Sequence, residues 1–130
     1  MQRIASLYVA HSEKEGRGVF TATPIPNESV IEICPMIVLK PEDTPEVDKT
    51  ELFNYYFLWG EQEDIAAIAL GYGSLYNHSF EPNARYLANY EDDTLTFCSI
   101  RDIEPGEEIT VNYNGLPDIQ ERFWLERELY

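Results

Sequence analysis

Short apolar and β-branched runs alternate with polar turn residues along most of the chain. The strand candidates lie at residues 4–10, 19–22, 30–34, 36–40, 84–90, 94–100 and 108–113, and most are bounded by Pro, Gly, Asn or charged residues. The acidic triplet at 91–93 separates two of these runs and predicts a hairpin. The pattern therefore predicts a mainly β fold.

Helical structure is expected only in short pieces. The apolar, alanine-rich segment 65–70 is expected to form one or two helical turns, and 52–59 is ambiguous between helix and strand. Residues 41–50 are acidic and contain proline, which indicates a loop. Asp118 is followed three residues later by Glu121, the spacing of an N-cap with its capping-box partner, which predicts a C-terminal helix from about residue 118.

Length and charge narrow the class of protein. The 130 residues fit one domain spanning 1–130, and the net charge of -15 favours cationic partners over nucleic acid or an anionic membrane, although it also serves solubility alone. Cys34 and Cys98 lack metal-ligand spacing, so no metal is expected. No apolar run approaches the ~20 residues of a membrane span. We expect an intracellular protein, cytoplasmic because no basic nuclear-import cluster is visible, or nuclear in a eukaryotic host.

Three segments carry residue types suited to a functional site. They are the glycine-containing turn segment 15–20 (EGRGVF), the polar loop 75–83 with its apolar flank (LYNHSFEPN) and the run 105–113 (PGEEITVNY). Each has an ordinary interpretation when taken alone: a tight turn, a loop whose side chains cap local backbone, and a turn followed by a strand. Their occurrence together and in this order is far more specific.

In that order, the three segments resemble the SET-domain family of protein-lysine methyltransferases, in the minimal free-standing form of viruses and bacteria. The resemblance implies a β-clip fold of several small sheets, with a C-terminal pseudoknot made by the Asn77–His78 segment and the strand before Tyr113. It also implies methylation of lysine in a basic, histone-like protein, with S-adenosylmethionine as the cofactor. Phe80 stands where many relatives have cysteine, and no cysteine cluster follows Tyr113. Zinc-binding modules before or after the domain are therefore not expected.

The resemblance also assigns roles to single residues. Tyr113 would position the lysine at the reacting centre, and Tyr56 and Tyr86 match channel tyrosines, although each is also a plausible packing aromatic. The residues expected to contact the cofactor are Glu15, Gly16, Arg17, Gly18, Asn77, His78, Tyr113 and Trp124. Phe123 is an alternative to Trp124 for closing the cofactor site, and Trp124 could equally be a packing residue. Val111, where many relatives carry Phe or Tyr, predicts that higher methylation states are permitted.

Two other interpretations stay open at this point. An inactive SET domain could act as a binding module for a basic peptide, and small SET proteins could self-associate as homodimers. The sequence identifies neither the substrate protein nor its target lysine.

Overall fold

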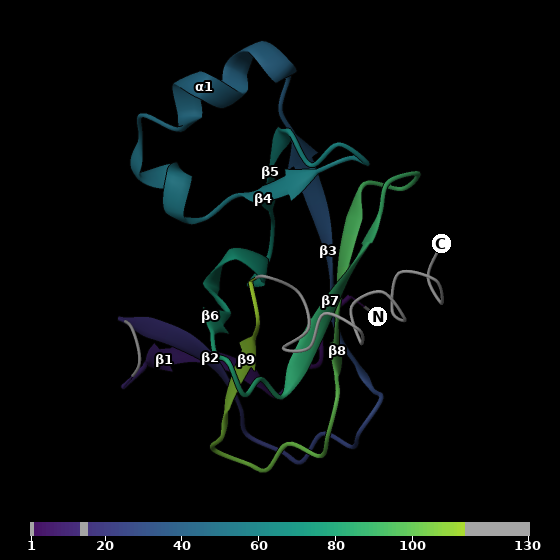
Figure 1. Cartoon of the computed structure of the whole chain (residues 1–130). Helices are drawn as coiled ribbons and strands as arrows, with labels where there is room; N and C mark the ends of the chain where they lie inside the picture. The colour runs from purple at the N-terminus through teal and green to yellow at the C-terminus, as the bar shows by residue number, and fades with distance from the viewer. Residues whose placement is uncertain (1, 14–15, 114–130) are drawn as a thin grey trace.

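Two curved β-sheets form the body of the molecule, with short helical segments beyond one end of the larger sheet (Figure 1). The computed structural model describes residues 2–13 and 16–113. One sheet has the strand order β1-β2-β9-β6 and the other the order β4-β5-β3-β8-β7. The predicted mainly β fold is confirmed.

The four-stranded sheet joins segments from both ends of the described chain. It consists of β1 (Leu7–His11), β2 (Arg17–Thr21), β9 (Glu108–Val111) and β6 (Asn77–His78). β2 is antiparallel to β1 and to β9, whereas β6 is parallel to β9. A parallel pair needs a long connection, and here that connection carries two strands of the other sheet. This is the pairing that the family resemblance predicted.

The five-stranded sheet consists of β4 (Phe57–Trp59), β5 (Ile65–Ala69), β3 (Val30–Val38), β8 (Thr94–Ser99) and β7 (Ala84–Asn89). β7 and β8 form the predicted hairpin, in register from Ala84↔Ser99 to Asn89↔Thr94. All strand pairs in this sheet are antiparallel. Such a sheet can bury one face and leave the other toward solvent.

A single strand, β3, runs through Pro35, where the sequence predicted two separate strands. β3 pairs with β8 as far as Pro35↔Thr94 and with β5 from Met36↔Ala69 onward. Proline has no backbone N–H to donate, which is tolerated here because the strand changes partner at this residue. The Pro35 carbonyl still accepts a hydrogen bond from the Leu70 N–H at 3.0 Å.

The helical expectation for 65–70 is wrong, because this segment forms β5 between β4 and β3. Ala66 and Ala67 are fully buried there, so sheet pairing and packing outweigh alanine's helix preference. The expected loop 41–50 instead contains η1 (Pro41–Asp43) and α1 (Thr44–Val47), each with proline in its first turn. η2 (Glu51–Asn54) and η3 (Gly73–Leu75) are two further single turns. The predicted helix from about residue 118 lies outside the described residues.

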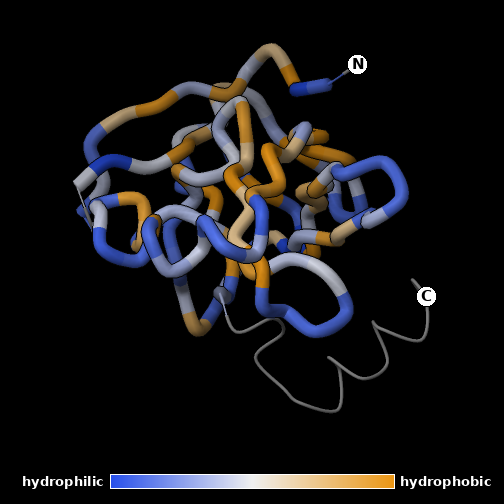
Figure 2. The backbone as a smooth tube through the Cα atoms, turned by 90° about the horizontal axis from the view of Figure 1, so that it is seen from above, coloured by the Kyte–Doolittle hydropathy of each residue, from blue (hydrophilic) through white to orange (hydrophobic). Residues whose placement is uncertain are grey.

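The core contains apolar side chains from both sheets. Figure 2 shows hydrophobic segments gathered in the middle of the molecule and hydrophilic loops around them. Val19, Ile31, Phe97, Ile109 and Val111 are fully buried members of one contiguous cluster. β9 therefore serves two purposes: its residues anchor the core, and its end delivers Tyr113 to the surface.

Candidate active site

One end of the four-stranded sheet brings the three sequence motifs together. Val19 pairs with Ile109 and Phe20 with Glu108, so the beginning of β2 lies beside the end of β9. On the other side of β9, His78 pairs with Val111. The glycine turn, the Asn77–His78 segment and Tyr113 are thus neighbours, although almost a hundred residues separate the first from the last.

Tyr113 is held at this edge by three hydrogen bonds. Its hydroxyl donates to the Tyr76 carbonyl oxygen at 2.6 Å, and its N–H donates to His78 Nδ1 at 2.9 Å. Its own carbonyl accepts from the Tyr86 hydroxyl at 3.0 Å. Because the hydroxyl hydrogen points to the Tyr76 carbonyl, the oxygen faces any further group as a hydrogen-bond acceptor. The side chain is fixed in direction, yet the residue stays 46% exposed, so a ligand can reach it.

His78 connects the polar loop to Tyr113. Since Nδ1 accepts the Tyr113 N–H, the proton of a neutral His78 lies on Nε2. The imidazole is 5.2 Å from the Tyr113 ring and packs against the edge of Phe80 at 4.6 Å, between ring centroids. Phe80 is 73% exposed, so it adds an apolar surface beside the tyrosine.

The Asn77 side chain joins the glycine turn to β9. Its amide donates to the Arg17 carbonyl at 2.9 Å and to Glu108 Oε2 at 2.8 Å. The other carboxylate oxygen of Glu108 accepts from the Ser12 hydroxyl at 2.7 Å. A Cβ on Gly18 would come within 2.3 Å of Glu108 Oε2. The second glycine of the turn is thus required for a close approach, and its partner within the protein is this carboxylate.

Asn83, the last residue of the polar loop, fastens that loop to β9. Its Oδ1 accepts from the buried Thr110 N–H at 2.8 Å, and its Nδ2 donates to the Glu108 carbonyl at 2.8 Å and to Glu107 Oε2 at 3.2 Å. The residue is 2% exposed. An asparagine so placed satisfies buried backbone groups that the short β6 strand cannot reach.

The two candidate channel tyrosines have different surroundings. Tyr86 contacts Tyr113 and packs its ring edge-on against Phe57 at 5.3 Å. Tyr56 instead donates to Asp48 Oδ1 at 2.6 Å, and this hydrogen bond raises the pKa of its hydroxyl. The structure therefore brings Tyr86 to Tyr113, while Tyr56 contacts Asp48 and Phe53 of its own segment. It is the ring of Phe57, the residue after Tyr56, that packs against Tyr86.

The remaining site candidates are partly outside the described residues. Glu15 and Trp124, with Phe123, fall there. Gly16 has a positive φ of 56° and accepts from the Ser12 N–H at 2.9 Å, which closes the turn. Val111 is fully buried in the core.

Four residues that the sequence interpretation did not assign to the site contribute to it. Ser12, Tyr76, Asn83 and Glu108 make the contacts described above. Tyr76, Asn83 and Glu108 belong to segments that were singled out, so those segments themselves could have suggested their proximity to the site. Ser12 carries no comparable signal, because it lies outside these segments and contributes through the hydroxyl that it donates to Glu108.

The groups at this edge fit a positively charged ligand. The Tyr113 hydroxyl oxygen is a hydrogen-bond acceptor, and the Ser12 and Asn77 side chains that donate to the Glu108 carboxylate are both neutral. A partly buried carboxylate held by neutral donors attracts a cation such as a sulfonium or an ammonium group. Within residues 2–13 and 16–113, no group of three or more His, Cys, Asp or Glu side chains could hold a metal ion. In the same ranges no helix is long and apolar enough to cross a membrane.

Comparison with known proteins gives consistent matches. The SET domain family model matches residues 16–114. A Schizosaccharomyces pombe histone-lysine N-methyltransferase, H3 lysine-37 specific, is 29% identical over 123 residues, covering 94% of this chain and 78% of the relative. The activity in that name is the activity of the S. pombe relative.

Solved structures show the same fold. The crystal structure of a candidate histone methyltransferase of Plasmodium falciparum superposes with a TM-score of 0.67 at 28% identity, covering 87% of this chain and 95% of that one. Polycomb Repressive Complex 2 of Chaetomium thermophilum, bound to S-adenosylmethionine, gives a TM-score of 0.71 at 20% identity. That match covers 95% of this chain and 17% of the other, and at this identity it supports the fold alone.

Proposed function

The chain belongs to the SET-domain family of protein-lysine methyltransferases, and from this premise we propose that it methylates lysine side chains of a basic protein with S-adenosylmethionine as methyl donor. The observation that carries the proposal is the fixed Tyr113 at the junction of the three motifs. Its hydroxyl is bonded to Tyr76 and its N–H to His78, while the residue remains accessible. A histone-like protein inside the cell is the substrate class that we favour, in line with the name of the S. pombe relative.

The cofactor is proposed to lie along the glycine turn and the Asn77–His78 segment. S-adenosylmethionine supplies an electrophilic methyl group on a positively charged sulfur. On the protein side, the Arg17–Gly18 backbone, Asn77 and His78 would hold it, and the Glu108 carboxylate would favour its positive charge. The Tyr113 oxygen, whose hydrogen is directed at the Tyr76 carbonyl, would act as the acceptor of weak C–H···O bonds from a polarised methyl group.

The lysine must arrive as a neutral amine. From a reference pKa near 10.4, deprotonation at pH 7 costs about 4.6 kcal/mol. A nearby positive charge and an apolar aromatic surface both favour the neutral form. Tyr86 with Phe57 supplies such a surface next to Tyr113. We assign to Tyr113 the orientation of the amine lone pair, which is a positional contribution. Water is assigned as the acceptor of the proton that the lysine loses.

The acidic surface supports a cationic protein substrate. A net charge of -15 raises the local concentration of basic chains and speeds their encounter. The same charge stabilises the ammonium form of lysine, so the local surroundings of Tyr113 have to dominate once the side chain has entered. Recruitment and deprotonation are thus assigned to different parts of the molecule.

A non-catalytic role as a basic-peptide binding module is the second candidate, and one experiment separates the two. The protein is incubated with methyl-labelled S-adenosylmethionine and a mixture of histones, and transfer is compared with that of Tyr113→Phe. Tyr8→Phe is the matched control, because Tyr8 has similar exposure, 39% against 46%, and stacks on Phe20 through its ring. Transfer that Tyr113→Phe abolishes and Tyr8→Phe keeps supports the enzyme; peptide binding without any transfer by the unaltered protein supports the binding module.

A further inference from the structure

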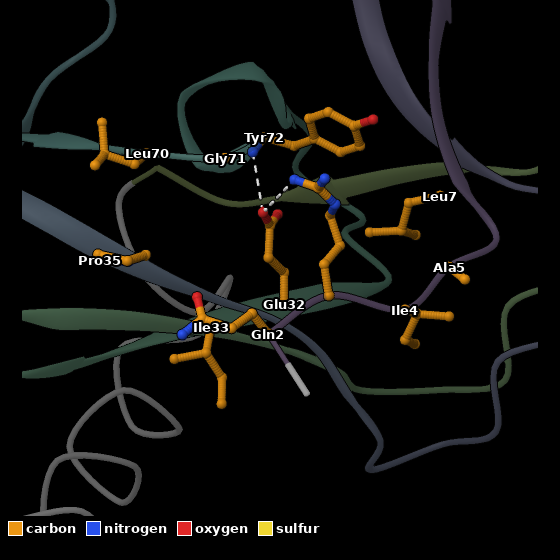
Figure 3. A pocket seen from close by; sticks show the side chains of 11 residues that line it. Gln2, Ile4, Ala5, Leu7, Glu32, Ile33, Pro35, Leu70, Gly71 and Tyr72 are labelled. Atoms are coloured by element: carbon orange, nitrogen blue, oxygen red, sulfur yellow. Dashed lines mark hydrogen bonds and ion pairs between the residues drawn. The ribbon is translucent and has the colours of Figure 1, made fainter.

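A buried carboxylate lies in the five-stranded sheet, at a residue that neither the motifs nor the proposed chemistry uses. Glu32 is in β3 and is 2% exposed. Its side chain points toward the Gly71–Tyr72 segment, and together they line a pocket of about 610 Å³ (Figure 3). A buried carboxylate is costly unless hydrogen-bonded, so its partners indicate what it is for.

Three donors converge on Glu32. The Tyr76 hydroxyl donates to Oε1 at 2.6 Å, and the Tyr72 N–H donates to Oε2 at 3.0 Å. The Arg3 guanidinium lies 3.4 Å from Oε2 and 4.1 Å from the centre of the Tyr72 ring. Gly71, with a φ of 68°, leaves the space for the carboxylate, since a Cβ there would come within 2.3 Å of Oε2.

The contact with Tyr76 leads directly to the candidate active site. Tyr76 is 1% exposed, and its ring stacks on Phe97 with 4.2 Å between centroids. Its hydroxyl is bonded to Glu32, and its backbone carbonyl accepts the Tyr113 hydroxyl at 2.6 Å. One residue therefore joins the buried carboxylate to the exposed tyrosine through two short hydrogen bonds.

We propose that Glu32 is a positioning residue for the methyl transfer: it fixes Tyr76, and the Tyr76 carbonyl in turn fixes the direction of the Tyr113 hydroxyl. The inference rests on the proposed function for its catalytic consequence. The position of the Tyr76 carbonyl depends on how the side chain is held. Stacking on Phe97 fixes the plane of the ring, and the hydrogen bond to Glu32 fixes the position of its hydroxyl. Without that anchor, the Tyr113 hydroxyl loses a fixed acceptor, and its lone pairs lose their fixed direction.

The test uses variants that remove the link with little change of shape. Tyr76→Phe deletes only the hydroxyl, and Glu32→Ala deletes the carboxylate. Glu32→Gln keeps the shape, and its amide can accept from the Tyr72 N–H and donate to the Tyr76 hydroxyl. Ser99→Ala is the control: Ser99 is also buried, at 1% exposure, but its hydroxyl bonds to Pro26.

Two readouts separate positioning from general stability. The first is steady-state kinetics with labelled cofactor and a histone substrate. The second is the fluorine NMR signal of Tyr113 in protein made with 3-fluorotyrosine, assigned among the nine tyrosines by its loss in Tyr113→Phe. We expect Tyr76→Phe and Glu32→Ala to lower kcat about ten-fold with KM values within about two-fold, and to shift the Tyr113 signal. Glu32→Gln is expected to recover most of kcat, and Ser99→Ala to leave kcat and the signal unchanged.

The contrary results are equally defined. An unchanged Tyr113 signal in Tyr76→Phe overturns the inference, whether or not kcat falls, because any loss would then come from elsewhere. A shifted signal with unchanged kcat also overturns it. A wild-type protein that transfers no methyl group counts against the proposed function instead, and the fluorine signal still decides whether Glu32 positions Tyr113.

Discussion

The Glu108 carboxylate occupies the space that a side chain on residue 18 would need. An ideal Cβ on Gly18 would lie 2.3 Å from Glu108 Oε2 and 3.0 Å from Asn77 Nδ2. Carboxylate and amide are bonded to each other at 2.8 Å and thus form a unit built against bare backbone. The glycine is therefore fixed by packing from β9 and β6, in addition to any role that it has toward a ligand.

Gly18→Ala is expected to displace this unit and to lower the stability by about 1–3 kcal/mol, the usual effect of overpacking. Methyl transfer should fall further than stability alone explains, because Asn77 moves with Glu108. Urea unfolding and initial rates measure the two effects. Gly60→Ala is the control, since a Cβ there meets open space and only the φ of 87° is strained, a cost of about 1 kcal/mol. Equal rates in both variants would contradict the prediction.

His78→Ala is expected to reduce kcat about ten-fold, because the Tyr113 N–H loses its acceptor and the residue its fixed position. His78→Asn should recover part of this loss, since an asparagine Oδ1 can take the place of Nδ1. Steady-state rates of the two variants at saturating cofactor provide the measurement. An asparagine variant no better than alanine would show that the imidazole acts through something other than this hydrogen bond.

Asn83→Ala is expected to destabilise the protein by about 2–3 kcal/mol, because it leaves buried groups of β9 without partners. The lost contacts are those to the Thr110 N–H, the Glu108 carbonyl and Glu107. Asn89→Ala is the matched control on the exposed turn of the β7–β8 hairpin and should cost less than about 1 kcal/mol. Denaturant midpoints in urea compare the two; a similar shift in both would argue against a special role of Asn83.

The pH dependence of stability has a defined sign at Glu107. The Arg101 guanidinium, which donates to its carboxylate, holds the pKa of Glu107 below its usual 4.5, with help from the Glu104 N–H and Asn83. A lowered folded-state pKa stabilises the protein above the unfolded-state value, and this contribution is lost as the pH falls through the folded-state value. The stability difference between wild type and Glu107→Gln should therefore shrink from about pH 6 to about pH 3. A difference that grows on acidification would refute the assignment.

The thiol of Cys34 is expected to be inert in the folded protein. Burial, with the nearby Glu32, raises its pKa far above the ordinary value, and the residue is fully buried. In a Cys98→Ser variant, a thiol reagent at neutral pH should modify Cys34 about 100-fold more slowly than in urea. Fast modification of the native variant would mean that the sheet around β3 opens readily.

Sequence reasoning identified the segments that meet at the candidate site because each of them is contiguous in the chain. Gly16–Gly18, Asn77–His78 and Tyr113 each stand in a short run with recognisable turn or strand chemistry. Tyr86, which the family resemblance implied, contacts Tyr113 through its hydroxyl. What a single sequence lacks is the register between distant strands, which decides that His78 meets Val111 and that Glu108 meets the glycine turn.

The errors have local physical causes. The segment 65–70 has the alanine content of a helix. It forms a strand because β5 pairs with β4 and β3 and its alanines are buried in the packed sheet. Pro35 read as a strand boundary, and only the change of partner along β3 shows why it is not one. Glu32 could have been noticed from the sequence, because it is the one carboxylate in the apolar run 30–34. A charge within a strand that is predicted to be buried needs a hydrogen-bonding partner.

The parallel pairing of β6 with β9 has a consequence for how the protein folds. Asn77 meets Thr110 only when the intervening chain, which carries the β7–β8 hairpin, closes as a loop, because no short turn connects parallel neighbours. Closing this loop is a non-local event with a large entropic cost, and it is the step that brings His78 to Tyr113. We therefore expect catalytic competence to appear late in folding, once β6 has paired with β9.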